Sequence, residues 1–353
     1  MTFRRKGSAS SEWLLLLALG ALSCEAPPQH EHAAPTDGAR RTAVPERVND
    51  AASGGRGATP GPEPTRTPPP GVSQPTPTGR SADADSFEPT SPSQVRIAVI
   101  GDYGWAGPAE QQVAELVDSF RVDFVITTGD NNYPVGAAET IDDNIGQYFS
   151  ELIHPYLGSY PSSATENRFF PVLGNHDWYT EDAAPYLAYF TLPGNERYYD
   201  IVRGDVHFFA IDSDEREPDG ISADSVQGQW LKRGLESSTA AFKLVAMHHP
   251  PFSSGPHGNS PLLQWPYAAW GADVVLAGHD HGYERLEVDG IPYIVSGLGG
   301  ASLYSYGEPV EPSLVRYSEH YGAALIEADS RELKLSFFDV DGRLIDSTAI
   351  AAR

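Results

Sequence analysis

Short apolar runs alternate with polar, glycine-containing segments from residue 94 to the end of the chain. Runs rich in β-branched and aromatic residues and bounded by turn residues predict buried strands. These strands are predicted at 94–100, 124–128, 169–173, 206–211, 242–247 and 273–277. Helices are predicted at 108–120 and 228–235, and hairpins within 321–345. The pattern therefore indicates an α/β protein with two packed mixed β-sheets flanked by helices.

Residues that can bind metal ions follow five of these strands. They are Asp102, Asp130 with Tyr133, Asn175, His248, and His279 with His281. Because the carboxyl ends of strands in a parallel or mixed sheet meet in one crevice, we expect these side chains to lie together. Histidines with a purely structural role would have no reason to follow strands.

The donor set is larger than one zinc ion needs, since a zinc site takes three or four protein ligands. Two ions that share Asp130 would each receive four protein ligands and keep positions open for water and substrate. The phenol of Tyr133 is a hard oxygen ligand, and it favours Fe(III) over softer cations. The residues therefore predict a site for two metal ions.

The start of the chain predicts export. Arg4–Lys6 precede an apolar run at Trp13–Leu22, which is too short to span a bilayer, so residues 1–24 are predicted to be a signal peptide. Cys24 is the only cysteine and stands where a bacterial lipoprotein signal places its lipidated cysteine, although Ala21 replaces the usual branched residue. The alternatives are a lipoprotein of the cell envelope, periplasmic or at the cell surface, and a secreted protein.

Residues 25–94 are rich in Pro, Ala, Thr, Gly and Ser, which predicts a disordered linker, and 95–353 is the predicted catalytic domain. The first 94 residues carry 9 Lys and Arg against 10 Asp and Glu, so nearly all of the formal net charge of −24 lies in the predicted domain. Such an acidic surface repels polyanions, and nucleic acid is not an expected partner. A phosphorylated substrate would have to be attracted locally, for which metal ions are the obvious means.

Five segments together resemble the metal motifs of purple acid phosphatases, a branch of the calcineurin-like metallophosphoesterases. They are Gly101-Asp102-Tyr103-Gly104, Gly129-Asp130-Asn131-Asn132-Tyr133, Gly174-Asn175-His176, Val245-Ala246-Met247-His248 and Gly278-His279-Asp280-His281. Most of the superfamily has a histidine where this chain has Gly104, whereas the purple branch has the tyrosine that stands here as Tyr133. The resemblance covers residues 95 to about 340 and implies a four-layer α/β/β/α sandwich.

The resemblance also implies the role of each residue. It assigns Asp102, Asp130, Tyr133 and His281 to Fe(III), and Asp130, Asn175, His248 and His279 to a divalent Fe, Zn or Mn ion. His176 and His257 would act on the substrate as catalytic residues. His257 lies in a Gly-Pro segment that predicts a mobile loop, and an exposed loop histidine without function is the alternative. Asp177 and Tyr283-Glu284-Arg285 are assigned to packing or to support of the ligands.

The implied activity is hydrolysis of small phosphate monoesters by a hydroxide held on the two ions. A phosphodiesterase or nucleotide phosphatase would use the same residues, and a redox enzyme would use the same iron. A non-catalytic surface binding module is a more remote alternative. The sequence leaves the physiological substrate, the second metal and the oligomeric state open.

Overall fold

A computed structural model describes residues 94–353 of the protein. The predicted signal peptide at 1–24, its Cys24 and residues 25–93 of the predicted linker lie outside the described residues. Within 94–353, no helix combines the length and the apolar character needed to cross a membrane.

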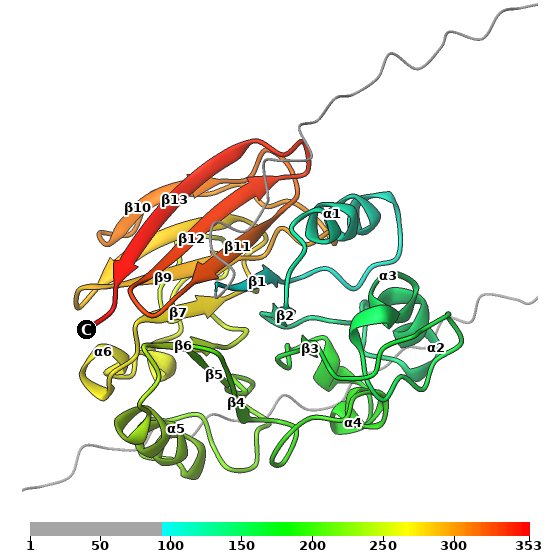
Figure 1. Ribbon diagram of the computed structural model, residues 1–353, viewed down its shortest axis with the longest axis horizontal. Coiled ribbons are helices and arrows are strands. Elements are labelled where there is room, and N and C mark those ends of the chain that lie inside the picture. Colours follow the sequence, from blue (N-terminus) through cyan, green and yellow to red (C-terminus); the bar gives the residue numbers. More distant parts are fainter. Residues whose placement is uncertain (1–93) are drawn as a thin grey trace, which may run out of the picture. The chain divides into compact units, whose positions relative to one another are not determined.

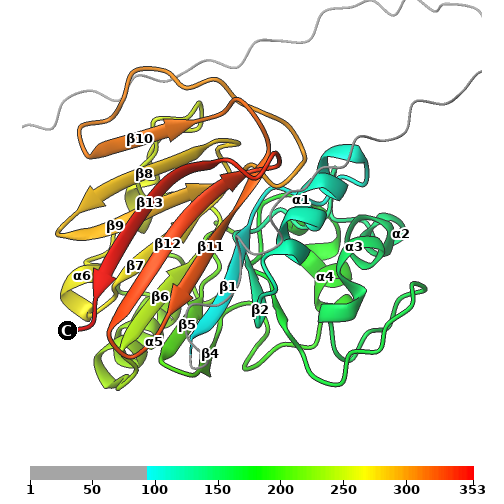
Figure 2. The same cartoon turned by 45° about the horizontal axis from the view of Figure 1, so that its top comes forward.

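Two mixed β-sheets form the centre of the described unit (Figure 1). The first has the strand order β13-β12-β11-β1-β2-β3 and the second has the order β10-β8-β9-β7-β6-β5-β4. The first sheet contains β1 (Val95–Ile100), β2 (Phe124–Thr127), β3 (Phe169–Phe170), β11 (Gly322–Ala328), β12 (Glu332–Asp339) and β13 (Leu344–Ala351). The second contains β4 (Tyr199–Arg203), β5 (Val206–Ala210), β6 (Phe242–Ala246), β7 (Val274–Ala277), β8 (Tyr283–Val288), β9 (Ile291–Ser296) and β10 (Ser313–Tyr317). In Figure 2 the two sheets overlie one another.

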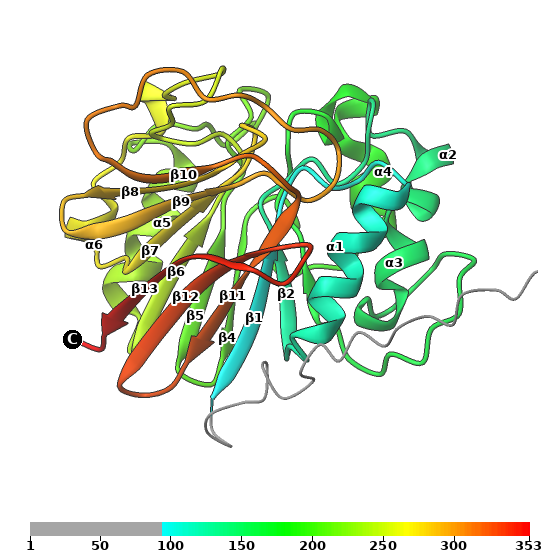
Figure 3. The same cartoon turned by 90° about the horizontal axis from the view of Figure 1, so that it is seen from above.

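Helices cover both outer faces of this pair of sheets. The helices are α1 (Pro108–Ser119), α2 (Ala138–Ile141), α3 (Gln147–Phe149), α4 (Ala184–Tyr189), α5 (Val226–Ser237) and α6 (Tyr267–Trp270). In Figure 3, α1 to α4 lie beside the first sheet, and α5 and α6 lie beside the second. The predicted layer order α/β/β/α is confirmed.

The period-2 alternation of strand side chains produces two hydrophobic clusters. Phe208 and Leu244 of the second sheet belong to the large cluster that also contains the buried residues of the first sheet. Their chain neighbours Phe209 and Val245 point the other way, into a second cluster with Leu231 of α5. Because β5, β6 and β7 are buried on both faces over most of their length, they read as nearly continuous apolar runs, which only His207 in β5 and Lys243 in β6 interrupt.

The predicted strands and helices are present, with two informative differences. β3 ends at Phe170 instead of residue 173, because Pro171 has no N–H to continue the ladder. The ligand-bearing strands also belong to two sheets: β1, β2 and β3 lie in the first, and β6 and β7 lie in the second. The predicted crevice is therefore formed by the carboxyl ends of strands from both sheets.

Candidate metal centre

The seven predicted metal ligands lie on the loops that follow β1, β2, β3, β6 and β7. Three of them have a left-handed backbone, with φ of 55° at Asp102, 53° at Asp130 and 69° at His279. This conformation is uncommon for residues other than glycine, and such strain is concentrated at functional sites. Gly129, with φ of 94°, has no room for a Cβ atom, which would lie 2.6 Å from Nδ1 of His248. The loops therefore approach one another as closely as their backbones permit.

The four residues assigned to Fe(III) meet around one phenol. The Tyr133 hydroxyl lies 3.0 Å from Oδ2 of Asp130, 3.3 Å from Oδ1 of Asp102 and 3.1 Å from Nε2 of His281. Nε2 of His281 is also 3.2 Å from Oδ1 of Asp102. Three oxygens and one nitrogen thus converge on a single point.

The residues assigned to the divalent ion meet around His248. Its Nε2 atom lies 3.0 Å from Oδ1 of Asn175, 3.1 Å from Nδ1 of His279 and 3.3 Å from Oδ2 of Asp130. Asp130 belongs to both groups, as the prediction of a shared ligand requires. One carboxylate oxygen each from Asp102 and Asp130 and one nitrogen of His248 lie within 4.8 Å of one another.

Hydrogen bonds around the site orient the lone pairs of His248 and Asn175 toward the centre of the group around His248. Nδ1 of His248 lies 2.8 Å from the carbonyl oxygen of Thr128, which can only accept, so Nδ1 carries a proton. Asn175 donates its amide N–H to the Tyr179 hydroxyl at 2.9 Å, which turns its oxygen toward His248. Carboxylate, amide and imidazole acceptors that face one another need a cation between them, and the residues present fit metal ions.

Electrostatics leads to the same conclusion. Burial would lower the pKa of His248, but the carboxylate of Asp130 and the more distant Asp102 raise it to about 10. The site therefore favours a positive charge at His248, which either a proton or a metal ion can supply. Burial, Asp102 and Asp130 raise the pKa of Tyr133 well above its usual value, so its phenolate would form only on a strongly acidic cation.

His176 lies directly beside the predicted ligands. Its backbone N–H donates to Oδ1 of Asp130 at 2.9 Å, and its ring centre lies 4.4 Å from that of Tyr133. Nδ1 is 2.6 Å from the carbonyl oxygen of Pro134 and must donate there, which leaves Nε2 available at 3.9 Å from Oδ2 of Asp130. The ring is therefore placed at the edge of the donor cluster and is about one-third exposed.

His257 is exposed and stacks on a predicted ligand, with its ring centre 4.0 Å from that of His279. Buried carboxylates hold the backbone of the loop that contains it, for which mobility stays a prediction. Asp280 accepts from the His257 N–H at 3.0 Å and from the Ser253 hydroxyl at 2.5 Å. Glu284 accepts from both the backbone N–H and the hydroxyl of Ser254.

The supporting residues identified in the sequence have the contacts that packing and support require. Asp177 is buried and accepts from the Gly174 N–H at 2.9 Å and from the Asn131 side chain at 2.8 Å, so it ties together the loops after β2 and β3. Tyr283 and Arg285 both donate to Asp346 of β13, which joins the second sheet to the first.

Sequence reasoning missed several residues that contact the cluster. The Ser302 hydroxyl lies 2.6 Å from Nδ1 of His281, and the Tyr304 ring stacks on that imidazole with the ring centres 4.1 Å apart. His249 directly follows the predicted ligand His248, and one of its nitrogens lies within 4.8 Å of nitrogens of His248 and His279. The pair His248-His249 was the only sequence signal for any of them.

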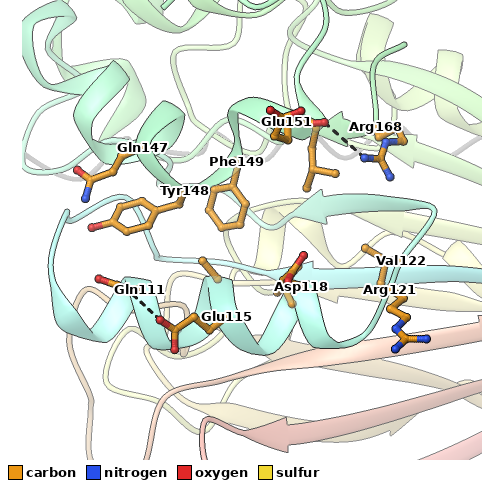
Figure 4. A pocket seen from close by; sticks show the side chains of 13 residues that line it. Gln111, Glu115, Asp118, Arg121, Val122, Gln147, Tyr148, Phe149, Glu151 and Arg168 are labelled. Atoms are coloured by element: carbon orange, nitrogen blue, oxygen red, sulfur yellow. Dashed lines mark hydrogen bonds between the residues drawn. The ribbon is translucent and has the colours of Figure 1, made fainter. Parts of the chain in front are cut away.

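Two cavities of similar volume lie in different parts of the described unit. One, of about 580 Å³, is lined by Asn175 and His279 and therefore adjoins the donor cluster. The other, of about 540 Å³, lies between α1 and the segment containing α3 (Figure 4), and none of the nine predicted site residues lines it. Figure 4 shows long polar side chains along its walls, among which Arg168 donates to the backbone carbonyl oxygen of Glu151 and Gln111 donates to the Glu115 carboxylate. The first cavity is the one that the chemistry can use.

Comparison with known proteins gives consistent results. The chain is similar to purple acid phosphatase 17 of Arabidopsis thaliana, with 27% identity over 295 residues that cover 72% of this chain and 84% of the relative. It is 24% identical to human tartrate-resistant acid phosphatase type 5 over 310 residues, or 73% of this chain and 91% of the relative. These relatives confirm the predicted resemblance to purple acid phosphatases.

Solved structures share the fold. A purple acid phosphatase from yellow lupin (Lupinus luteus) seeds superposes with a TM-score of 0.60 and 19% identity, over 75% of this chain and 55% of that one. GAP50, described as the anchor in the inner membrane complex of Plasmodium, gives a TM-score of 0.59 and 19% identity, over 74% of this chain and 89% of that one. At this identity the likeness concerns the fold alone.

The family model for calcineurin-like phosphoesterases matches residues 95–283, which is more than half of the chain and includes all nine predicted site residues. This match confirms the prediction of a metal-dependent phosphoesterase, a hydrolase. The chain belongs to the calcineurin-like phosphoesterase family.

Proposed function

We propose that the chain is a two-metal phosphatase of the purple acid type, which hydrolyses small phosphate monoesters. The convergence of seven donor side chains on two points that share Asp130 carries this proposal. Asp102, Asp130, Tyr133 and His281 would hold Fe(III), and Asp130, Asn175, His248 and His279 would hold a divalent Fe, Zn or Mn ion. This division of the ligands between the two ions matches the two groups of contacts, one around Tyr133 and one around His248.

Two bound ions would supply positive charge for the phosphoryl group and an activated water as nucleophile. The protein's own side chains would hold the metal ligands in position. His248 is oriented by Thr128, and Asn175 by Tyr179, so both donors are fixed before substrate arrives. No nucleophilic serine or cysteine is needed.

His176 and His257 are proposed to act on the substrate without binding metal. Nε2 of His176 is available beside Asp130, and the exposed imidazole of His257 lies over His279. Either can protonate the leaving oxygen or hold the phosphate. The retained donor set supports an enzyme over a surface binding module, which could lose ligands without cost.

Export, with a lipid at Cys24, is proposed from the sequence pattern at 1–24 alone. The linker at 25–94 would then separate the domain from the membrane surface. Phosphodiester and nucleotide substrates are the alternatives at the same site, and comparing their hydrolysis rates with those of monoesters separates these activities.

The experiment that tests the proposal replaces the shared ligand. Asp130→Asn removes the charge that both ions need, so the turnover of nitrophenyl phosphate should fall by several orders of magnitude. Elemental analysis should show reduced occupancy of both metals. Asp118→Asn, at an exposed position in α1, is the matched control and should retain the activity of the unmodified protein. Near-normal hydrolysis by Asp130→Asn would refute the two-metal proposal.

The two histidines can be separated by leaving group. The variant that lacks the general acid should lose about a hundredfold on alkyl phosphates, whose alkoxides need a proton, and much less on nitrophenyl phosphate. His176→Ala and His257→Ala should both keep two metal ions per molecule. Equal losses on both substrates would assign these side chains to phosphate positioning, and loss of metal would make the residue a ligand.

A further inference from the structure

His249 contacts the donor cluster but belongs to neither group of predicted metal ligands. We propose that its Nε2–H donates a hydrogen bond to a phosphoryl oxygen of the bound substrate, which makes it a catalytic residue in addition to His176 and His257. The inference rests on the proposed function, because it adds a phosphate-binding donor to the same site.

The Ser213 hydroxyl determines which nitrogen of His249 carries a proton. Its oxygen accepts from the backbone N–H of His248 at 3.2 Å and from that of His249 at 2.9 Å. A hydroxyl has two lone pairs and one proton, so these two bonds leave it only its own proton to offer. Nδ1 of His249 lies 3.0 Å from the same oxygen and therefore accepts a hydrogen bond from it. The ring is thus neutral and carries its one proton on Nε2.

Buried contacts hold Ser213 in place on the loop that follows β5. The neighbouring Asp212 is fully buried, and its carboxylate accepts from the Trp178 indole N–H at 2.9 Å. The backbone N–H of Asp212 donates to the Gln227 side chain at 2.7 Å. The fold therefore sets the tautomer of His249 before substrate arrives, and a donor that is fixed in advance needs no reorganisation during the reaction.

The His249 ring lines the cavity of about 580 Å³ that adjoins the donor cluster. Asn175 and His279, both proposed ligands of the divalent ion, line the same cavity, and the ring centres of His249 and His279 are 4.5 Å apart. Because Nδ1 is turned to Ser213, Nε2 is the nitrogen left for a ligand in this cavity. Among residues 94–353, no side chain or carbonyl group accepts a hydrogen bond from it. A phosphate held at the cluster would supply the missing acceptor.

A neutral donor suits a site that is proposed to hold two cations. Positive charges a few ångströms apart repel one another, so an imidazolium at this position would weaken metal binding, whereas a neutral N–H would not. Arg216 is the one lysine or arginine among the residues that line the cavity, and it donates to Asp214 through two bonds of 2.6 and 2.7 Å. Since that guanidinium is already paired, His249 is the better placed donor for a phosphoryl oxygen on this side of the cluster.

Calorimetry with inorganic phosphate on the metal-loaded protein tests the donor role. A hydrogen bond to a charged group changes an equilibrium constant by about tenfold or more, so we expect His249→Leu to raise the Kd of phosphate about tenfold while two metal ions per molecule remain bound. His249→Gln keeps an N–H donor and should recover most of this loss. His320→Leu, at an exposed histidine that does not line the cavity, is the matched control and should leave the Kd unchanged.

The tautomer can be measured without any variant. In the zinc-loaded protein, proton–nitrogen NMR correlations of the His249 ring should show a proton on Nε2 and none on Nδ1. A proton on Nδ1 would overturn the proposal, as would an unchanged Kd in His249→Leu, equal losses in His249→Leu and His249→Gln, loss of metal from either variant, or no binding of phosphate by the unmodified protein. Failure of the proposed function has a different signature. The unmodified protein would then not hydrolyse nitrophenyl phosphate, whereas failure of this inference alone leaves that hydrolysis intact.

Discussion

Asp280 offers the sharpest test of how the His257 loop is positioned. Its carboxylate is buried between the predicted ligands His279 and His281 and accepts from the Ser253 hydroxyl and the His257 N–H, at 2.5 and 3.0 Å. A Cβ atom on Gly255 would lie 2.2 Å from the Asp280 carboxyl carbon, so the loop packs directly on this side chain. Asp280→Ala removes the acceptor and leaves a space under the loop.

The expected loss in the free energy of unfolding follows from these two hydrogen bonds. A hydrogen bond to a charged group contributes about 1.5–3 kcal/mol, so two such bonds amount to about 3–6 kcal/mol. Because His257 is exposed, water can accept from its N–H in place of Asp280. We therefore expect Asp280→Ala to lower the free energy of unfolding by about 3 kcal/mol, the lower end of this range. Asp280→Asn keeps one acceptor oxygen and should cost about 1–2 kcal/mol of the free energy of unfolding. Urea unfolding of the metal-loaded protein measures both values, with Asp118→Ala as the exposed control.

We expect activity to fall when the His257 loop loses the support of Asp280. Without Asp280 the His257 ring is no longer held 4.0 Å from His279, so we expect Asp280→Ala to lower kcat on alkyl phosphates about tenfold while two metal ions remain bound. In a His257→Ala background the same change should cause no further loss, because its effect on rate passes through His257. An additional loss in that background, or release of metal, would show that Asp280 acts on the predicted metal ligands and not through His257.

Three further predictions use other parts of the chain. Tyr133→Phe should bleach the visible absorption expected of a phenolate on Fe(III), and an active, colourless protein with only zinc or manganese would contradict the ferric assignment. A chain that begins at Ser93 should keep its activity per molecule, since the preceding linker pattern contains none of the candidate ligands. Burial raises the pKa of Glu110 well above its unfolded value of about 4.3, so stability falls as pH rises above that value. Glu110→Gln should therefore increase the free energy of unfolding more at pH 7 than at pH 4. Glu115→Gln, at an exposed position in the same helix, is the control and should not show this difference. Equal effects of Glu110→Gln at both pH values would mean that Glu110 does not titrate on unfolding.

The sequence predicted the donor cluster because each ligand follows a buried strand within a few residues. Asp102 and Asp130 are examples, since an apolar run and the Gly-Asp pair after it are both local signals. The sequence did not show that β1 and β7 belong to different sheets. Sheet membership depends on strand pairing, and β1 pairs with β11, which is distant in sequence, while β7 pairs with β9, from which β8 separates it. Local pattern thus predicted the grouping of these candidate ligands more reliably than it predicted the membership of the two sheets.

The residues that surround the ligands could not be found in this way. Ser302 and Tyr304 lie in a polar loop without periodicity, and only the tertiary fold brings them to His281. The segment 136–168 forms short helices and turns, and its Asn144 donates to the carbonyl oxygen of Tyr133 at 3.0 Å, a contact with no sequence signature. Pairs of this kind depend on distances in space, and the amino-acid pattern records only neighbours along the chain.

We propose that the protein hydrolyses a phosphate monoester with two metal ions that share Asp130 as a ligand. The most direct measurement removes all metal with a chelator, returns iron and then zinc in known amounts, and follows nitrophenyl phosphate hydrolysis against metal bound per molecule. We expect no activity without metal and a rise to a maximum at two ions per molecule, with Asp130→Asn inactive throughout. Full activity at one ion per molecule, or activity that survives complete removal of metal, would contradict it.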